Sequence, residues 1–152
     1  MFNFTNLKQK GHGDPSRDED GVVAFDPEAQ TFHILGMGYA IGHYARWITK
    51  DAVRLEATSG EPLVQVTAFR DDGRKTVVLV LLNNAAGTAQ VKVSLKGFGN
   101  KGVLKFEGEQ STAHAFWAKL PSFDGDAADR LHINIPARSV TSLSARLDRS
   151  EE

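Results

Sequence analysis

Residues 63–95 read LVQVTAFRDDGRKTVVLVLLNNAAGTAQVKVSL, which predicts three successive β-strands joined by two tight turns. Val77–Leu82 is a run of six apolar residues, half of them β-branched, as is typical of a strand covered on both faces. Asp71–Arg74 has turn composition, and we expect Gly73 to adopt a positive φ there. Gln90–Leu95 alternates polar and apolar residues, the pattern of a strand with one wet face. The stretch predicts a β-meander whose middle strand is the centre of a sheet.

The rest of the chain adds short apolar or alternating segments separated by Gly- and Pro-containing turns. Met37–Ile48 differs, because its apolar residues recur at three- and four-residue steps, which predicts a helix of about three turns. Pro121–Asp129 is expected to be a loop. The other expected strands are Val22–Phe25, Thr31–Leu35, Ala52–Ala57, Val103–Phe106, Ser111–Trp117, Leu131–Ile135 and Val140–Leu147. The pattern predicts an all-β fold, an antiparallel β-sandwich of about eight to nine strands with one short helix.

Length and composition are those of one ordinary globular domain. The 152 residues are 41% hydrophobic and 24% charged, with a net charge of -1, so we expect neither nucleic acid nor a membrane surface as partner. The absence of cysteine excludes disulfides and thiolate metal sites. No signal peptide is expected in this chain, and localisation stays open. We expect residues 1–20 to form a loop or tail, 21–148 the β-sandwich and 149–152 a second tail.

Three ordered motifs resemble glycoside hydrolase family 30. Tyr39–Thr58, YAIGHYARWITKDAVRLEAT, is similar to the segment in which these enzymes leave their barrel and enter a C-terminal β-sandwich, although Lys50–Asp51 replaces the usual Pro-Gly. Ala68–Asn84 is similar to the family's "AFRNPDGS…VVVLLNN" hairpin, and Ile135–Leu143 to its "LPA-S-V-T-T-L" ending. The chain is therefore identified as the C-terminal β-sandwich of a family 30-like enzyme, of the glucosylceramidase, xylanase or β-1,6-galactanase type.

The resemblance implies that the catalytic barrel is absent from this chain. Phe2–Phe4 and Lys10–Gly11 are similar to the last barrel strand and the loop after it, so residues 1–20 would include its remnant. Retaining glycosidases need two carboxylates about 5–5.5 Å apart, which this family carries on earlier barrel strands, the acid/base within an Asn-Glu-Pro motif. The only Glu-Pro here is Glu61–Pro62, which follows a glycine. We expect no enzymatic activity from this chain alone, whereas the parent would be a retaining, secreted or periplasmic hydrolase.

Two groups of aromatic and histidine side chains are candidate contact residues. Trp117, with His114 and Phe116, precedes a loop and could stack on a sugar, with core packing as the alternative. Adjacent strand side chains point to opposite faces, so at most one of Phe116 and Trp117 should face solvent. The helix carries the second group, which is expected to contact the barrel or another partner: Tyr39, His43, Tyr44 and Trp47. We also expect His43 to form hydrogen bonds where the helix meets the sheet.

Neither a metal nor a cofactor is predicted. The five histidines lack the HxH or HxxxH spacing of zinc sites. Asp124, Asp126 and Asp129 have the oxygen ligands that calcium prefers, but solvated turn residues are the favoured interpretation. No nucleophile elbow, P-loop or dinucleotide fingerprint is present.

The leading interpretation is a non-catalytic accessory domain that packs on a (β/α)₈ barrel, stabilises it and extends its glycan-binding surface. Without the barrel, the exposed apolar face should promote self-association. A free-standing carbohydrate-binding module is the first alternative and predicts an exposed aromatic platform around Trp117. A protein-interaction domain that binds through the helix is the second.

Overall fold

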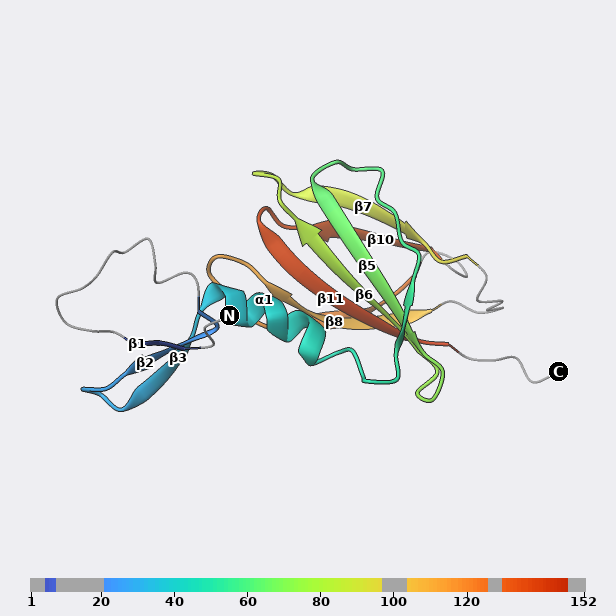
Figure 1. The fold of residues 1–152 in the computed structure, drawn as a ribbon. Coiled ribbons are helices and arrows are strands. Elements are labelled where there is room, and N and C mark those ends of the chain that lie inside the picture. The colour runs from blue at the N-terminus through green and yellow to red at the C-terminus, as the bar shows by residue number, and fades with distance from the viewer. Residues whose placement is uncertain (1–4, 8–20, 97–103, 126–129, 148–152) are drawn as a thin grey trace. The chain divides into compact units, whose positions relative to one another are not determined.

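The computed structural model describes residues 5–7, 21–96, 104–125 and 130–147 (Figure 1). The chain divides into two compact units, residues 1–42 and 43–152. Each unit is described by itself below. The one helix of the described residues, α1 (Gly36–Ala45), crosses this division and ends three residues earlier than the sequence predicts. After it, the amides of Trp47 and Ile48 donate to the carbonyl of Tyr44 in a closing turn.

The first unit holds a three-stranded sheet of β1 (Thr5–Leu7), β2 (Val23–Asp26) and β3 (Thr31–Ile34). β1 runs parallel to β2, and β2 and β3 form an antiparallel hairpin. Part of the predicted tail is therefore a strand, while residues 1–4 and 8–20 lie outside the described residues. Among the described residues, β2 and β3 pair only within this small sheet. The predicted domain bounds near residues 20 and 148 stay a prediction.

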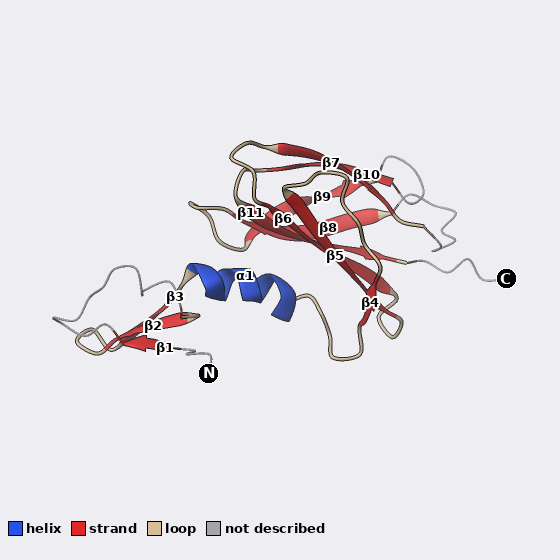
Figure 2. Cartoon of the chain, turned by 45° about the horizontal axis from the view of Figure 1, so that its top comes forward, coloured by secondary structure: helices blue, strands red, loops and turns tan. Residues whose placement is uncertain are grey.

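The second unit confirms the predicted β-sandwich. A six-stranded antiparallel sheet has the order β4-β5-β6-β11-β8-β9, and a two-stranded antiparallel sheet pairs β10 with β7 (Figures 1 and 2). The bounds are β4 (Val53–Leu55), β5 (Val64–Asp71), β6 (Thr76–Asn83), β7 (Ala89–Ser94), β8 (Lys105–Ser111), β9 (Ala118–Asp124), β10 (Arg130–Ile135) and β11 (Ser139–Arg146).

β6 lies at the centre of the larger sheet, as its apolar run predicts. Val77, Leu79 and Leu81 belong to the core between the sheets, and Val78 and Val80, on the opposite face, are also buried. Both faces of the strand are therefore covered. The core continues through fully buried residues of the other strands, chiefly Phe106, Leu131, Ile135 and Leu143.

The predicted meander is wrong at its third strand, because β7 pairs with β10 in the other sheet. The second edge of β6 is taken by β11 along its whole length. Asn83 fixes the place where the chain leaves the larger sheet: its amide nitrogen donates to the carbonyls of Gly87, Ile135 and Pro136 at 3.0, 3.1 and 2.8 Å. One buried side chain thus holds both the β6–β7 loop and the turn before β11.

The β5–β6 turn also differs in detail from the sequence prediction. Gly73 has no positive φ; Lys75 takes the left-handed conformation instead, with φ 52°. The Asp71 carboxylate stabilises the turn by accepting the Arg74 amide at 2.8 Å. It also accepts the Thr49 hydroxyl at 2.6 Å. These hydrogen bonds, that from Thr49 first, lower the pKa of Asp71.

The region around Trp117 differs from the prediction of a strand at Ser111–Trp117 followed by a loop at Pro121–Asp129. Residues 112–117 form a turn rather than a strand, and β9 occupies much of the expected 121–129 loop. β9 is an edge strand that pairs only with β8, through a register shift between Phe106 and Gly108. Pro121 is tolerated there because an edge strand or bulge does not require every backbone N–H.

Candidate functional site

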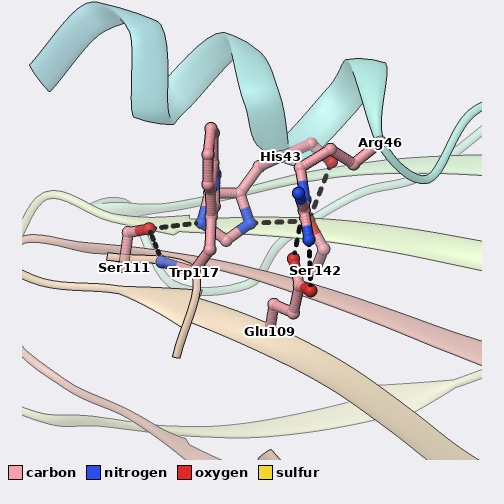
Figure 3. Close-up of polar contacts among 6 residues, drawn as sticks. All are labelled: His43, Arg46, Glu109, Ser111, Trp117 and Ser142. Carbon is pink, nitrogen blue, oxygen red and sulfur yellow. Dashed lines mark hydrogen bonds and ion pairs between the residues drawn. The ribbon is translucent and has the colours of Figure 1, made fainter. Parts of the chain in front are cut away.

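A polar cluster lies where the end of α1 meets the face of the six-stranded sheet, entirely within residues 43–152 (Figure 3). Its side chains come from the end of α1, from β8, from β11 and from the turn between β8 and β9. They are His43, Arg46, Glu109, Ser111, Trp117 and Ser142.

His43 is the centre of this cluster and has 0% of its surface exposed. Its Nδ1 lies 2.8 Å from the Ser142 hydroxyl and its Nε2 lies 2.8 Å from the Ser111 hydroxyl. Ser142 donates its one proton to the carbonyl of His43 at 2.9 Å, so it must accept from Nδ1–H. Ser111 accepts the amide of Trp117 at 2.9 Å and can therefore donate to Nε2. A neutral imidazole with its proton on Nδ1 satisfies every group in this chain of hydrogen bonds.

The electrostatics of the site also favour the neutral imidazole. Burial lowers the pKa of His43; the nearby Glu109 carboxylate opposes this effect and the Arg46 guanidinium adds to it. A proton on Nε2 would leave the Ser111 hydroxyl without an acceptor. The predicted hydrogen-bonding role of His43 between helix and sheet is confirmed.

Arg46 connects the helix end to both β8 and the β8–β9 turn. Its Nη2 and Nε donate to the two carboxylate oxygens of Glu109 at 2.7 and 3.1 Å, a fork-like pairing. These hydrogen bonds lower the pKa of Glu109 against the effect of burial, and the Trp47 indole adds to the lowering. The Arg46 guanidinium carbon also lies 4.7 Å from the centre of the Trp117 ring, within cation–π range.

The three predicted sugar-contact residues, His114, Phe116 and Trp117, all lie on the single turn 112–117. The Thr112 hydroxyl accepts the amides of His114 and Ala115, and Trp117 has a left-handed φ of 47° that is uncommon for a non-glycine residue. Phe116 is 48% exposed, whereas Trp117 is half-buried. Their role in glycan binding stays a prediction.

The expected partner-contact residues of α1 differ in their surroundings. His43 is inside the chain, so its side chain is not available to a partner, contrary to its place in that group. Tyr44 is exposed along one side, makes an edge contact with Phe69 at 6.5 Å between ring centres, and accepts the Thr67 hydroxyl. Trp47 and Tyr39 are half-buried. The Trp47 indole nitrogen is buried near Glu109 without hydrogen-bond geometry to any described residue.

The cluster brings a histidine beside two serines, the residue types of a hydrolytic nucleophile and base. Their burial excludes that use, because neither substrate nor water can reach a fully buried imidazole and both hydroxyl protons have acceptors within the chain. The arrangement instead holds the end of α1 on the sheet.

Within the described residues, no group of three or more His, Cys, Asp or Glu side chains is placed to hold a metal ion. In the same part of the chain, no helix has the length and apolar character needed to cross a membrane.

A hollow of about 890 Å³ lies at the open edge of the sandwich between β5 and β7. Residues 55–61 form one wall, and core side chains such as Leu79 and Leu81 form its floor. Half of its lining residues are aliphatic, and the charged ones are Glu56, Glu61, Arg70, Lys92 and Lys96.

The sequence did not point to four members of the polar cluster: Arg46, Glu109, Ser111 and Ser142. The available signal is a polar residue where a central strand should be apolar, as at Ser142 between the buried Thr141 and Leu143. Glu109 and Arg46 are 63 residues apart, and no sequence pattern connects them.

Comparisons with known proteins agree with the geometry. A family model described as the glycosyl hydrolase family 30 beta sandwich domain matches residues 51–143. No curated protein matches the chain.

Three solved structures with the same fold are family 30 xylanases. That from Clostridium acetobutylicum, of subfamily 8, has a TM-score of 0.71 and 23% identity, over 85% of this chain and 31% of that one. An endoxylanase from Clostridium papyrosolvens has a TM-score of 0.67 and 16% identity, over 81% and 30%. The catalytic domain of xylanase C from Talaromyces cellulolyticus has a TM-score of 0.63 and 18% identity, over 93% and 29%. This chain thus spans about a third of the length of these relatives, 31% in the first of them.

Proposed function

Because the chain belongs to the family of glycoside hydrolase family 30 β-sandwich domains, we propose that it is a non-catalytic accessory domain that packs on a (β/α)₈ barrel and stabilises it. Family 30 enzymes carry their catalytic activity in a separate barrel domain. The parent would be a retaining glycoside hydrolase.

The observation that carries the proposal is the apolar surface of α1. Met37 and Ile41 are one helical turn apart and 52% and 46% exposed, and Tyr44 follows three residues later. Exposed large apolar residues at helical spacing are typical of an interaction surface. Of the four contact residues predicted on the helix, Tyr44 is the exposed one. We therefore add Met37 and Ile41 to it as the proposed contact with the barrel.

Exposed apolar residues of the sandwich unit support the same proposal. Val53 and Leu63 are both more than half exposed. A domain that leaves large apolar side chains uncovered gains stability when another domain covers them.

The test is to add this chain to a family 30 xylanase barrel from which the sandwich has been deleted, and to measure the barrel's melting temperature. We expect a rise in Tm, because ligands that bind only the folded state stabilise it. Ile41→Lys should remove most of the rise, whereas Asn134→Lys, at an exposed position of β10 outside the hollow, should keep it. No change of Tm at saturating chain would contradict barrel packing.

A carbohydrate-binding surface at the turn 112–117 is the second candidate function. Exposed Phe116 stands beside Trp117, whose position is fixed by the Ser111 hydrogen bond and the Arg46 contact. A prepositioned aromatic loses little entropy on binding a sugar. Affinity gels of xylan, β-glucan and galactan with Phe116→Ala and Trp117→Ala test this function; retention by no gel would exclude it.

A further inference from the structure

A second hollow, of about 570 Å³, lies at one end of the six-stranded sheet. It is formed where the β5–β6 turn, the start of β8 and the end of β11 meet. Three cationic side chains line it, one from each of these segments: Arg74, Lys105 and Arg146. Neither the barrel-packing proposal nor the polar cluster around His43 uses these residues.

The strand register places two of these cations next to each other. The β11–β8 ladder ends at the pair Ala145 and Phe106, so the following residue of β11 and the preceding residue of β8, Arg146 and Lys105, lie opposite one another. Like charges directly opposite across a ladder are destabilising. Among the described residues, neither Arg146 nor Lys105 forms an ion pair. An anion between them would relieve this repulsion.

The nearby carboxylates offset only part of the positive charge of the hollow. The Asp71 carboxylate lies 3.8 Å from Nε of Arg74, whose side chain is 69% exposed. This ion pair is therefore weak, because it is long and screened by solvent. Asp124 lies opposite Lys105 in the β8–β9 ladder, but their side chains do not form an ion pair. Among the described residues, Glu107 is the only acidic residue that lines the hollow. Its lining therefore has three cations and one carboxylate.

The rest of the lining is suited to a hydroxylated ligand. Thr76, Ser122 and Ser144 contribute three hydroxyls, each able to donate and accept a hydrogen bond. Phe106, the one aromatic residue of the lining, is 1% exposed and so offers no stacking face. Recognition at this position must depend on charge and hydrogen bonds.

We propose that this hollow binds an anionic group of a polysaccharide, a uronate carboxylate or a sulfate ester. Two guanidinium forks can each pair with the two oxygens of such a group, and the serine and threonine hydroxyls can bond to neighbouring sugar hydroxyls. The chain's net charge of -1 gives no general attraction for polyanions, so binding depends on this local arrangement. The proposal rests on the charges of the hollow and needs no barrel.

The test uses titration calorimetry of the chain with oligogalacturonate, dextran sulfate and uncharged dextran. We expect binding of at least one anionic glycan and none of uncharged dextran; which anionic glycan binds identifies carboxylate or sulfate as the group. Arg146→Ala and Lys105→Ala should each weaken binding about fivefold to tenfold, and Glu107→Gln should strengthen it about threefold. Raising the salt from about 0.05 to 0.5 M should weaken binding at least about fivefold.

Lys92→Ala on β7 is the matched control, because it removes one cation from the other sheet and should leave the affinity unchanged. Equal loss in this control, equal binding of uncharged dextran, or equal binding of inorganic sulfate or single-stranded DNA would overturn the proposal. Lys105→Gln and Arg146→Lys repeat the test if an alanine variant fails to fold. None of these outcomes bears on barrel packing, which has its own assay.

Discussion

Replacing Ser142 by alanine tests the hydrogen-bonded connection between α1 and the sheet. The substitution removes the acceptor of His43 Nδ1–H and the donor to the His43 carbonyl, both in a site with no solvent access. A buried polar group left without its partner costs about 1–3 kcal/mol. Because two groups lose their partner, we expect Ser142→Ala to lower the free energy of unfolding by about 2–4 kcal/mol.

Urea unfolding followed by tryptophan fluorescence measures this loss. The signal reports on the compact unit of residues 43–152, because both tryptophans, Trp47 and Trp117, lie in it. Ser144→Ala is the matched control: it is on the same face of β11 two residues later, half-buried, and makes no hydrogen bond through its hydroxyl with described residues. We expect it to change stability by less than about 0.5 kcal/mol. Equal effects of the two substitutions would refute the assignment of the His43 hydrogen bonds.

Three further predictions concern the same unit. Burial lowers the folded-state pKa of His43 below its unfolded value of about 6.5, so the unfolded chain binds more protons on acidification. The contribution of His43 to the free energy of unfolding should therefore be fully present above about pH 6.5 and decline below it. His43→Gln should flatten this decline in urea titrations between about pH 7.5 and 5, and an unchanged slope would show that other groups cause it. Asn83→Ala removes the side-chain donor to the carbonyls of Gly87 and Ile135, while the Pro136 carbonyl keeps the Ser139 hydroxyl as a donor. It should cost about 2–3 kcal/mol in the same assay, and a loss below about 1 kcal/mol would contradict its role at the sheet crossing. Gly108→Ala should destabilise strongly, because the added Cβ would collide with the Ser142 carbonyl, whereas Gly87→Ala has open space and should be tolerated; equal melting temperatures of the two variants would contradict this packing.

The sequence was sufficient to predict the sandwich and its central strand, because a long β-branched apolar run such as Val77–Leu82 can be satisfied only between two covering layers. Two of the segments that resemble family 30, Ala68–Asn84 and Ile135–Leu143, are joined in the structure through Asn83. Here local composition and tertiary contacts favour the same structure.

Strand partners could not be predicted in the same way. Alternation along Gln90–Leu95 shows that one face is wet, but it does not show which strand lies beside it, and β7 joins β10 rather than β6. Pro121 argued for a loop because a central strand excludes proline, although an edge strand does not. The turn around Trp117 depends on the hydrogen bond that the Trp117 amide donates to the Ser111 hydroxyl, and this contact has no signature in a single sequence.

The sequence singled out two members of the polar cluster, His43 and Trp117, and predicted the hydrogen-bonding role only for His43. A histidine on an amphipathic helix is expected at the sheet, but its partners Ser111 and Ser142 lie 68 and 99 residues away in the chain. Arg46 and Glu109 could not be paired before the sheet order was known. Long-range polar contacts of this kind follow from the topology and not from local sequence.

Hydrogen exchange of this chain, with and without the sandwich-deleted family 30 barrel, tests the accessory-domain account most directly. The account predicts slower exchange in peptides that cover α1, Gly36–Ala45, when the barrel is present, and no change in the turn 112–117. The same experiment with xylan in place of the barrel separates the two candidate functions. Unchanged exchange in α1 at saturating barrel, with protection of the 112–117 turn by xylan, would contradict barrel packing and favour a carbohydrate-binding module.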